Sequence, residues 1–168
     1  MIEIEGKKVG GEYRPYIIAE VGINAWDDLR LAKKFIEAAA DAGADAVKFQ
    51  THIADAEMVE TEMRAIGAGN VYDTVAQCEW SLGDHYELQS HANSHNITYL
   101  STPFSVEAVD MLDEIGVPAI KIGSGEMNDR HLIGRAARTG KPLLISTGMN
   151  TLDDIESTCA FLDDVTDK

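Results

Sequence analysis

Two lysines lie inside segments that otherwise read as buried β-strands. Lys48 and Lys121 are each flanked by Val, Phe or Ile. A lysine is rarely buried without an anionic partner, because its ammonium group loses its hydration there. The sequence therefore predicts a bound phosphate or carboxylate beside these lysines, or else an ion pair with Glu20 or Glu126.

Further polar side chains stand where the same kind of segment ends. Two of the turns that follow contain glycine, at 123–125 (Gly-Ser-Gly) and 146–148 (Ser-Thr-Gly). Glycine lets a backbone approach a ligand closely, and successive N–H groups can hold an oxyanion. One such turn is weak evidence for a ligand site, but two of them beside two strand lysines predict a phosphate site. The polar set comprises Glu20, Lys48, Gln50, Ser101, Thr102, Lys121, Ser124, Glu126, Ser146 and Thr147.

The elements that position these side chains alternate between strand and helix patterns, which indicates a parallel α/β architecture. The expected strands cover residues 16–22, 46–51, 97–101, 119–123 and 143–147. Capping signals mark three helix starts, at Asp27 or Asp28, at Ser81 with Asp84, and at Thr151 with Asp154. Within the second strand, Lys48 and Gln50 share one face because side chains alternate.

This rhythm favours an α/β fold of the (β/α)8 TIM-barrel type, since polar residues sit at the carboxyl end of every strand. A complete barrel takes about 250 residues, so we expect about five of eight β/α units here. Residues 1–168 then form one partial barrel domain, with a lead-in at 1–15 and a site-covering or accessory insertion at 53–80. Five strands leave two sheet edges unpaired, which predicts a fragment or missing units supplied from elsewhere.

The composition is acidic, with 29 Asp and Glu against 14 Lys and Arg and a formal net charge of −15. This charge disfavours nucleic acid or an anionic membrane as a partner. The apolar runs are far too short to span a bilayer and residues 1–11 are polar and charged, so we expect a cytoplasmic protein. An acidic surface of this kind also suits a salt-rich cytoplasm, as a hypothesis. Cys78 and Cys159 match no zinc or redox spacing, and we expect both to be reduced and semi-buried.

Five short motifs occur in order along the chain. They are AEVGIN at 19–24, ADAVKFQ at 44–50, LSTPF at 100–104, KIGSGE at 121–126 and GKPLLISTGM at 140–149. Together, in this register, they closely resemble the N-acetylneuraminate (sialic acid) synthase family. The resemblance implies a sugar-acid synthase that condenses phosphoenolpyruvate with N-acetylmannosamine to give N-acetylneuraminate and phosphate.

The resemblance also implies roles for the matching residues. Four substrate-binding positions face the phosphate and carboxylate of phosphoenolpyruvate: Lys121, Ser124, Ser146 and the nearby Thr102. Four catalytic positions remain: Lys48, Gln50 and Glu126, which face the sugar, and Glu20, at the floor of the site. The family reaction joins C3 of phosphoenolpyruvate to the aldehyde carbon, and water then attacks C2 with loss of phosphate.

The full-length family enzyme uses a divalent metal, Mn2+ or Mg2+, as a Lewis acid, and the resemblance implies a homodimer. Its metal-binding histidines and its C-terminal antifreeze-like domain match nothing up to Lys168, so we assign no metal ligand in this chain. The chain also departs from the family after Asn24. A His-Asn-Gly-like run is usual there, whereas Ala25, Trp26 and Asp27 follow here.

The five histidines offer a weaker signal. His91 and His95 are spaced four apart on an expected helix, with Glu87 one turn earlier, which is a possible metal face. That helix belongs to the outer ring, so we interpret the trio as solvated surface. His52 follows a strand and could line the site, while His85 and His131 read as ordinary helix-start residues.

Other functions remain open at this point. Close relatives in the family make legionaminic or pseudaminic acid from other N-acetylated sugars. Lys121 on a barrel strand also suits an aldolase that forms a lysine Schiff base. A truncated, inactive barrel fragment or interaction module is the non-enzymatic reading.

Overall fold

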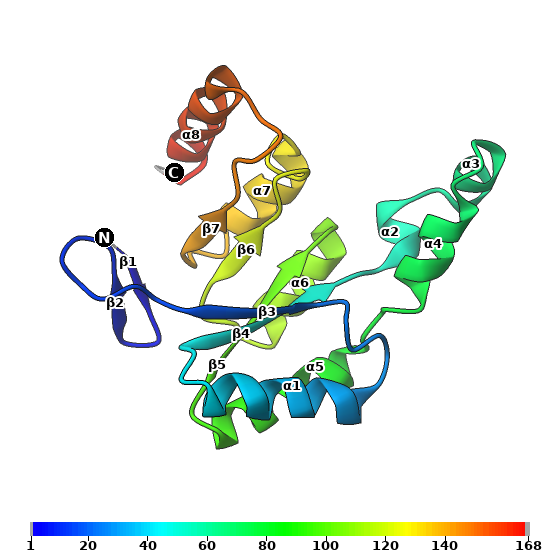
Figure 1. Ribbon diagram of the computed structural model, residues 1–168. Coiled ribbons are helices and arrows are strands. Elements are labelled where there is room, and N and C mark those ends of the chain that lie inside the picture. The colour runs from blue at the N-terminus through cyan, green and yellow to red at the C-terminus, as the bar shows by residue number, and fades with distance from the viewer. Residues whose placement is uncertain (1, 167–168) are drawn as a thin grey trace.

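The computed structural model describes residues 2–166, which fold into alternating strands and helices after an N-terminal hairpin (Figure 1). The strands are β1 (Ile2–Ile4), β2 (Lys7–Val9), β3 (Ile18–Gly22), β4 (Ala46–Thr51), β5 (Thr98–Pro103), β6 (Ile120–Ile122) and β7 (Leu143–Ile145). The helices are α1 (Leu29–Asp41), α2 (Ala54–Glu57), α3 (Glu60–Ala65), α4 (Gly69–Ala76), α5 (Leu82–Ser94), α6 (Val106–Glu114), α7 (Arg130–Ala137) and α8 (Leu152–Thr166).

The strands after the hairpin run parallel in the order expected for successive β/α units. β3, β4 and β5 form one hydrogen-bonded sheet, β6 and β7 form a second, and β5 packs beside β6. Each predicted strand is present, with ends that differ by at most two residues. The fifth strand stops at Ile145, so Thr147 lies in the loop that follows it.

Local capping chemistry starts the helices where the sequence predicts. The Asp28 side chain accepts hydrogen bonds from two backbone N–H groups of α1. Ser81 and Asp84 form a reciprocal capping box ahead of α5. Thr151 and Asp154 form the same pair of hydrogen bonds ahead of α8. These side chains replace the missing partners of the first turn, which defines each helix start.

Side-chain alternation divides the apolar residues into two cores. On one face of the strands, Val47, Phe49, Tyr99 and Ile120 pack against the surrounding helices. The opposite, inner face is apolar only near the strand starts. There a smaller cluster of Ala46, Leu100 and Ala119 is covered by Ile4 of the hairpin. The rest of the inner face is left to polar side chains.

Three details of the expected packing are wrong. Helical periodicity predicts Leu31 on the apolar face of the first helix, but Leu31 is exposed, and the buried face of α1 is made of Ala32, Ile36 and Ala39. Cys159 is exposed on α8, where Thr158 is the buried residue instead. Cys78 is fully buried, not semi-buried. Helical periodicity identifies these helices but leaves their rotation about the axis uncertain by one position.

Residues 53–80 form the three short helices α2, α3 and α4, which project to one side of the molecule (Figure 1). Among the helices of residues 2–166, none has the length and apolar character that crossing a bilayer requires.

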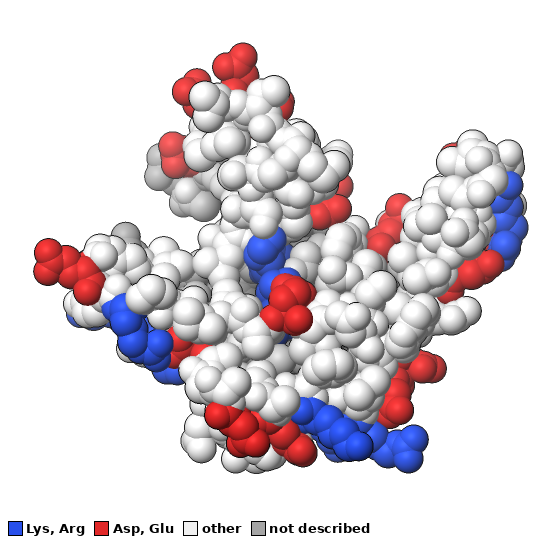
Figure 2. All heavy atoms as spheres, in the orientation of Figure 1, with Lys and Arg blue, Asp and Glu red and all other residues white. Residues whose placement is uncertain are grey.

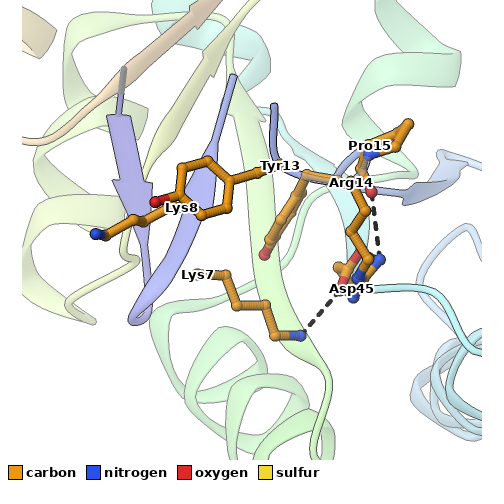
Figure 3. A pocket seen from close by; sticks show the side chains of 7 residues that line it. Lys7, Lys8, Tyr13, Arg14, Pro15 and Asp45 are labelled. Atoms are coloured by element: carbon orange, nitrogen blue, oxygen red, sulfur yellow. Dashed lines mark hydrogen bonds and ion pairs between the residues drawn. The ribbon is translucent and has the colours of Figure 1, made fainter. Parts of the chain in front are cut away.

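The amino-terminal ends of the strands are closed by a buried carboxylate. Asp45, 2% exposed, precedes β4 and accepts hydrogen bonds from Lys7 at 3.0 Å, Arg14 at 2.9 Å and the backbone N–H of Ile17 at 2.9 Å. Figure 3 shows these side chains converging in a small pocket that Tyr13 and Lys8 also line. The Arg14 guanidinium holds the pKa of Asp45 well below its usual range. This carboxylate joins the N-terminal hairpin to the sheet.

We expect Asp45→Asn to destabilise the fold by about 2 kcal/mol, because charge-assisted hydrogen bonds to a buried carboxylate are lost. Urea unfolding measures the loss. The matched control is Asp41→Asn, an exposed carboxylate on α1. Equal stability of the two variants would show that the hydrogen bonds of Asp45 contribute nothing to the stability of the fold.

His85 lies at the start of α5, as expected, but it is not an ordinary surface residue there. It is fully buried, and its Nδ1 lies 2.8 Å from the Tyr99 hydroxyl. Its Nε2 has no hydrogen-bond partner within residues 2–166. Burial lowers the pKa of His85 to about 4, since a charged imidazole would lose its hydration. His85 is therefore a neutral core residue of α5.

This pKa predicts a loss of stability in acid. Below pH 6.5, the ordinary histidine value, the unfolded chain takes up a proton that folded His85 refuses until about pH 4. The free energy of unfolding should therefore fall between these two values, by on the order of 3 kcal/mol from this group. Urea titrations across that range measure the slope.

His85→Gln should remove this part of the pH dependence, whereas His131→Gln, which changes an exposed histidine, should keep it. If the slope survives in His85→Gln, the acid sensitivity arises from other groups.

Candidate functional site

The polar residues predicted from the strand ends share the inner face of the sheet. Glu20 on β3 is the registered neighbour of Lys48 on β4, and Gln50 on β4 is the neighbour of Thr102 on β5. Lys121 follows the same alternation on β6. Figure 2 shows basic and acidic atoms side by side between β3 and the β6–β7 pair. The period of two along each strand brings these side chains together.

Lys48 is the centre of this group. Its Nζ lies 2.5 Å from a carboxylate oxygen of Glu20 and donates a hydrogen bond to the Thr102 hydroxyl at 3.0 Å. The Lys48 side chain is 9% exposed, whereas that of Glu20 is 50% exposed. These two contacts link β3, β4 and β5. Lys48 therefore has the anionic partner that its burial demands.

Lys121 lies near enough to Lys48 and Glu20 to interact with their charges. Its ammonium group donates to the backbone carbonyl of Ile122. Burial lowers the pKa of Lys121, and the positive charge of Lys48 lowers it further, while Glu20 and Glu126 oppose both effects. Two cations and two anions thus interact on one strand face. An anionic ligand placed between the lysines would relieve their mutual repulsion.

Glu126 folds back over the end of β6. A Cβ atom built onto Gly123 would overlap the Oε2 atom of Glu126, so this position of the carboxylate requires a glycine beneath it. The expected close approach at Gly123 is therefore made by a side chain of the same chain. This carboxylate lies near enough to Lys121 to affect its pKa.

The loops after β6 and β7 are joined by an asparagine that the sequence reading missed. The Asn150 amide donates to the backbone carbonyls of Ser124 and Gly148, both at 2.8 Å. Gly148 in turn neighbours the Ser124 side chain, since a Cβ built there would lie in ordinary contact, 3.9 Å from its Oγ. Ser146 follows β7, and its N–H donates to Ile122 at 3.0 Å. The two predicted serines thus stand on adjoining loops.

Gln50 makes a different set of contacts. Its Oε1 lies 2.9 Å from Nε2 of His52, whose Nδ1 lies 3.0 Å from the Glu57 carboxylate on α2. The His52 ring also stacks on Phe104. His52 therefore contacts Gln50, one of the residues expected at the site. Glu57 was missed, since nothing in the local pattern distinguishes it from other acidic residues.

A metal-ligand set lies elsewhere. Among residues 2–166, Glu37, His91 and His95 bring three possible ligand atoms within 4.8 Å of one another. They stand on α1 and at the end of α5, outside the strand face. Glu87, expected as the third member of that face, pairs instead with Lys33 at 2.6 Å.

The fold and site define an α/β protein whose charged side chains lie on one face of parallel strands, toward their carboxyl ends. A family model described as "NeuB family" matches residues 35–168. The chain belongs to the NeuB family.

Curated relatives carry sugar-acid synthase names. The chain is 42% identical over 147 residues to the N,N'-diacetyllegionaminic acid synthase of Campylobacter jejuni, covering 83% of this chain and 44% of that protein. It is 32% identical to the N-acetylneuraminate-9-phosphate synthase of Mus musculus, covering 90% of this chain and 44% of the relative. The chain thus spans about half the length of the curated relatives it matches.

Solved structures share the fold. The sialic acid synthetase of Leptospira borgpetersenii, solved with citrate, superposes with a TM-score of 0.87 at 32% identity, over 98% of this chain and 55% of that one. A truncated 3-deoxy-D-arabino-heptulosonate 7-phosphate synthase from Thermotoga maritima gives 0.70 at 13% identity, over 98% and 52%. The second likeness concerns the fold alone.

Proposed function

We propose that this chain carries the phosphoenolpyruvate-binding part of a sugar-acid synthase of the TIM-barrel type. The reaction condenses phosphoenolpyruvate with N-acetylmannosamine to give N-acetylneuraminate and phosphate. The observation that carries this proposal is the pair of lysines, Lys48 and Lys121, on one inner strand face. Membership of the NeuB family and the names of the relatives support it. In the proposed barrel, residues 1–168 supply five of eight β/α units.

The anionic substrate is assigned to the β6 and β7 side of the face. Lys121 supplies a charge-assisted hydrogen bond to the phosphate or carboxylate, and the hydroxyls of Ser124 and Ser146 supply further donors. Thr102 completes this set from β5. Asn150 holds the two serine loops at a fixed separation, which preorganises the donors before the substrate arrives.

The sugar is assigned to Lys48, Gln50 and Glu126, above the Glu20 carboxylate. Carbon–carbon bond formation moves the π electrons of phosphoenolpyruvate from C3 to the aldehyde carbon, leaving negative charge on the aldehyde oxygen. The Lys48 ammonium can stabilise that oxygen or give it a proton, and Glu20 then balances the charge that remains. Water adds at C2, and phosphate leaves.

A divalent cation, Mn2+ or Mg2+, would supply Lewis-acid polarisation of the aldehyde in such an enzyme. Within residues 2–166, the strand face brings no three His, Cys, Asp or Glu ligands together. The steps assigned to this chain are therefore binding, orientation and proton transfer only.

The sugar itself has a second candidate. The legionaminic acid synthase of Campylobacter jejuni is 42% identical to this chain, against 32% for the neuraminate-9-phosphate synthase. Trp26, in the loop after β3, is 46% exposed and has a positive φ of 49°. Its exposed aromatic ring is available to pack against a second acetamido group of the sugar.

Removing the Lys121 charge tests the phosphate assignment. We expect Lys121→Ala to weaken phosphoenolpyruvate binding about tenfold or more, since a charge-assisted hydrogen bond contributes roughly 1.5 to 3 kcal/mol. Calorimetric titration of the 168-residue chain measures the change. Lys34→Ala, which removes an exposed lysine of α1, is the matched control and should bind like the unaltered chain. Equal affinity in both variants would place Lys121 outside the site.

A lysine aldolase is the competing enzyme class, because the lowered pKa of Lys121 also favours a neutral, nucleophilic amine. A Schiff base with pyruvate would be trapped by borohydride and would add the mass of the reduced adduct to Lys121. We expect no such adduct by peptide mass spectrometry. A stoichiometric adduct that disappears in Lys121→Ala would replace the synthase proposal with the aldolase.

A further inference from the structure

Two neighbouring helices on the outer side of the fold present a histidine pair and a carboxylate to the same spot. α1 and α5 pack against each other. His91 lies in the last turn of α5 and His95 is its C-terminal capping residue, while Glu37 lies on α1. The Nε2 atom of His91 is 3.1 Å from Oε1 of Glu37. The rings of His91 and His95 have their centroids 4.5 Å apart.

The hydrogen bonds around His95 fix which ring nitrogen can bind a metal. Its Nδ1 lies 3.0 Å from the backbone carbonyl of His91 and 3.1 Å from the hydroxyl of Ser94. A carbonyl can only accept, so Nδ1 carries the proton, and in a neutral ring the lone pair is on Nε2. Metal-binding histidines are commonly oriented by such a bond from the second ring nitrogen.

The spacing also suits coordination. Bonds of about 2.0 to 2.1 Å in a tetrahedral site separate ligand atoms by about 3.3 Å. The Glu37 and His91 atoms are already close to that separation, and the three ligand atoms lie within 4.8 Å of one another. The Glu37 side chain is 47% exposed and that of His91 is 21% exposed, so a cation and a water ligand can reach the spot.

We propose that Glu37, His91 and His95 form a binding site for a divalent cation of the zinc class, which links α1 to α5. Two imidazoles and one carboxylate suit Zn2+, Ni2+ or Cu2+ and do not suit Mg2+ or Ca2+, which take oxygen ligands. The fourth position is left for water. The site is separate from the lysine-containing strand face and does not depend on the proposed function.

Topology places the two sites at opposite ends of the strands. Each helix runs back antiparallel to the strand before it, so the last turns of α1 and α5 lie toward the strand starts. The proposed catalytic residues lie toward the strand ends. A cation at Glu37, His91 and His95 is therefore structural, and it binds the folded state because α1 and α5 are brought together only on folding.

Zinc titration of the metal-stripped 168-residue chain tests this proposal. We expect calorimetry to show one Zn2+ bound per chain and thermal unfolding to shift upward with added ZnCl2. Co2+ should give the visible absorption bands of a four-coordinate site. MgCl2 is the control for loose attraction of cations to a chain of net charge −15 and should give neither the bands nor the same shift.

Substitutions assign the ligands. His91→Ala and His95→Ala should each weaken Zn2+ binding about tenfold or more and remove the Co2+ bands, and Glu37→Gln should weaken binding as well. His131→Ala, at an exposed histidine outside the trio, is the matched control and should bind like the unaltered chain. Circular dichroism checks that each variant is folded. Absence of Zn2+ binding in the unaltered chain, or equal binding in the His91→Ala, His95→Ala double variant, would overturn the proposal.

Discussion

A buried ammonium group needs an anion and a hydrogen-bond acceptor at fixed positions, and the arrangement of the central strands satisfies this need for Lys48. The parallel register sets Glu20 of β3 beside Lys48 of β4, and Thr102 of β5 completes the contacts. Removing Glu20 would leave the buried Lys48 ammonium without its anionic partner, and removing Thr102 would leave it one hydrogen-bond acceptor short. The three strands are thereby held in one register. A slip by one residue would turn every inner side chain outward.

The same alternation explains which parts of the fold could be predicted from the sequence. Lys48 and Gln50 were assigned to one face because apolar residues separate them, and the caps at Ser81 and Thr151 were assigned from neighbouring residues alone. These features are local. Neither the period of two nor a capping box depends on residues far along the chain, so the sequence contains all of the relevant information.

The features that were missed depend on residues brought together by folding. His85 looks like a polar residue in a first helical turn, yet α5 turns it inward onto Tyr99. Glu87 has the right spacing to lie beside His91, but it forms an ion pair with Lys33 of α1. Glu37 of α1 contacts His91 instead. Asn150 joins two loops whose proximity exists only once β6 and β7 have paired. No local pattern distinguishes such residues from ordinary surface ones.

The charge distribution assigns different tasks to the two ends of the strands. At the strand starts the Asp45 carboxylate is paired with two cations and a backbone N–H. Its charge is therefore fully used in stabilising the fold. At the strand ends the pKa of Lys121 is lowered, first by burial and then by the positive charge of Lys48, while Glu20 and Glu126 oppose both effects. A chain of net charge −15 would repel an anionic substrate at long range. Attraction must then arise at short range, where low solvent exposure strengthens the field of two adjacent lysines. Glu20 already pairs with Lys48, so Lys121, whose ammonium group donates to a backbone carbonyl, is the cation that suits this end to anion binding.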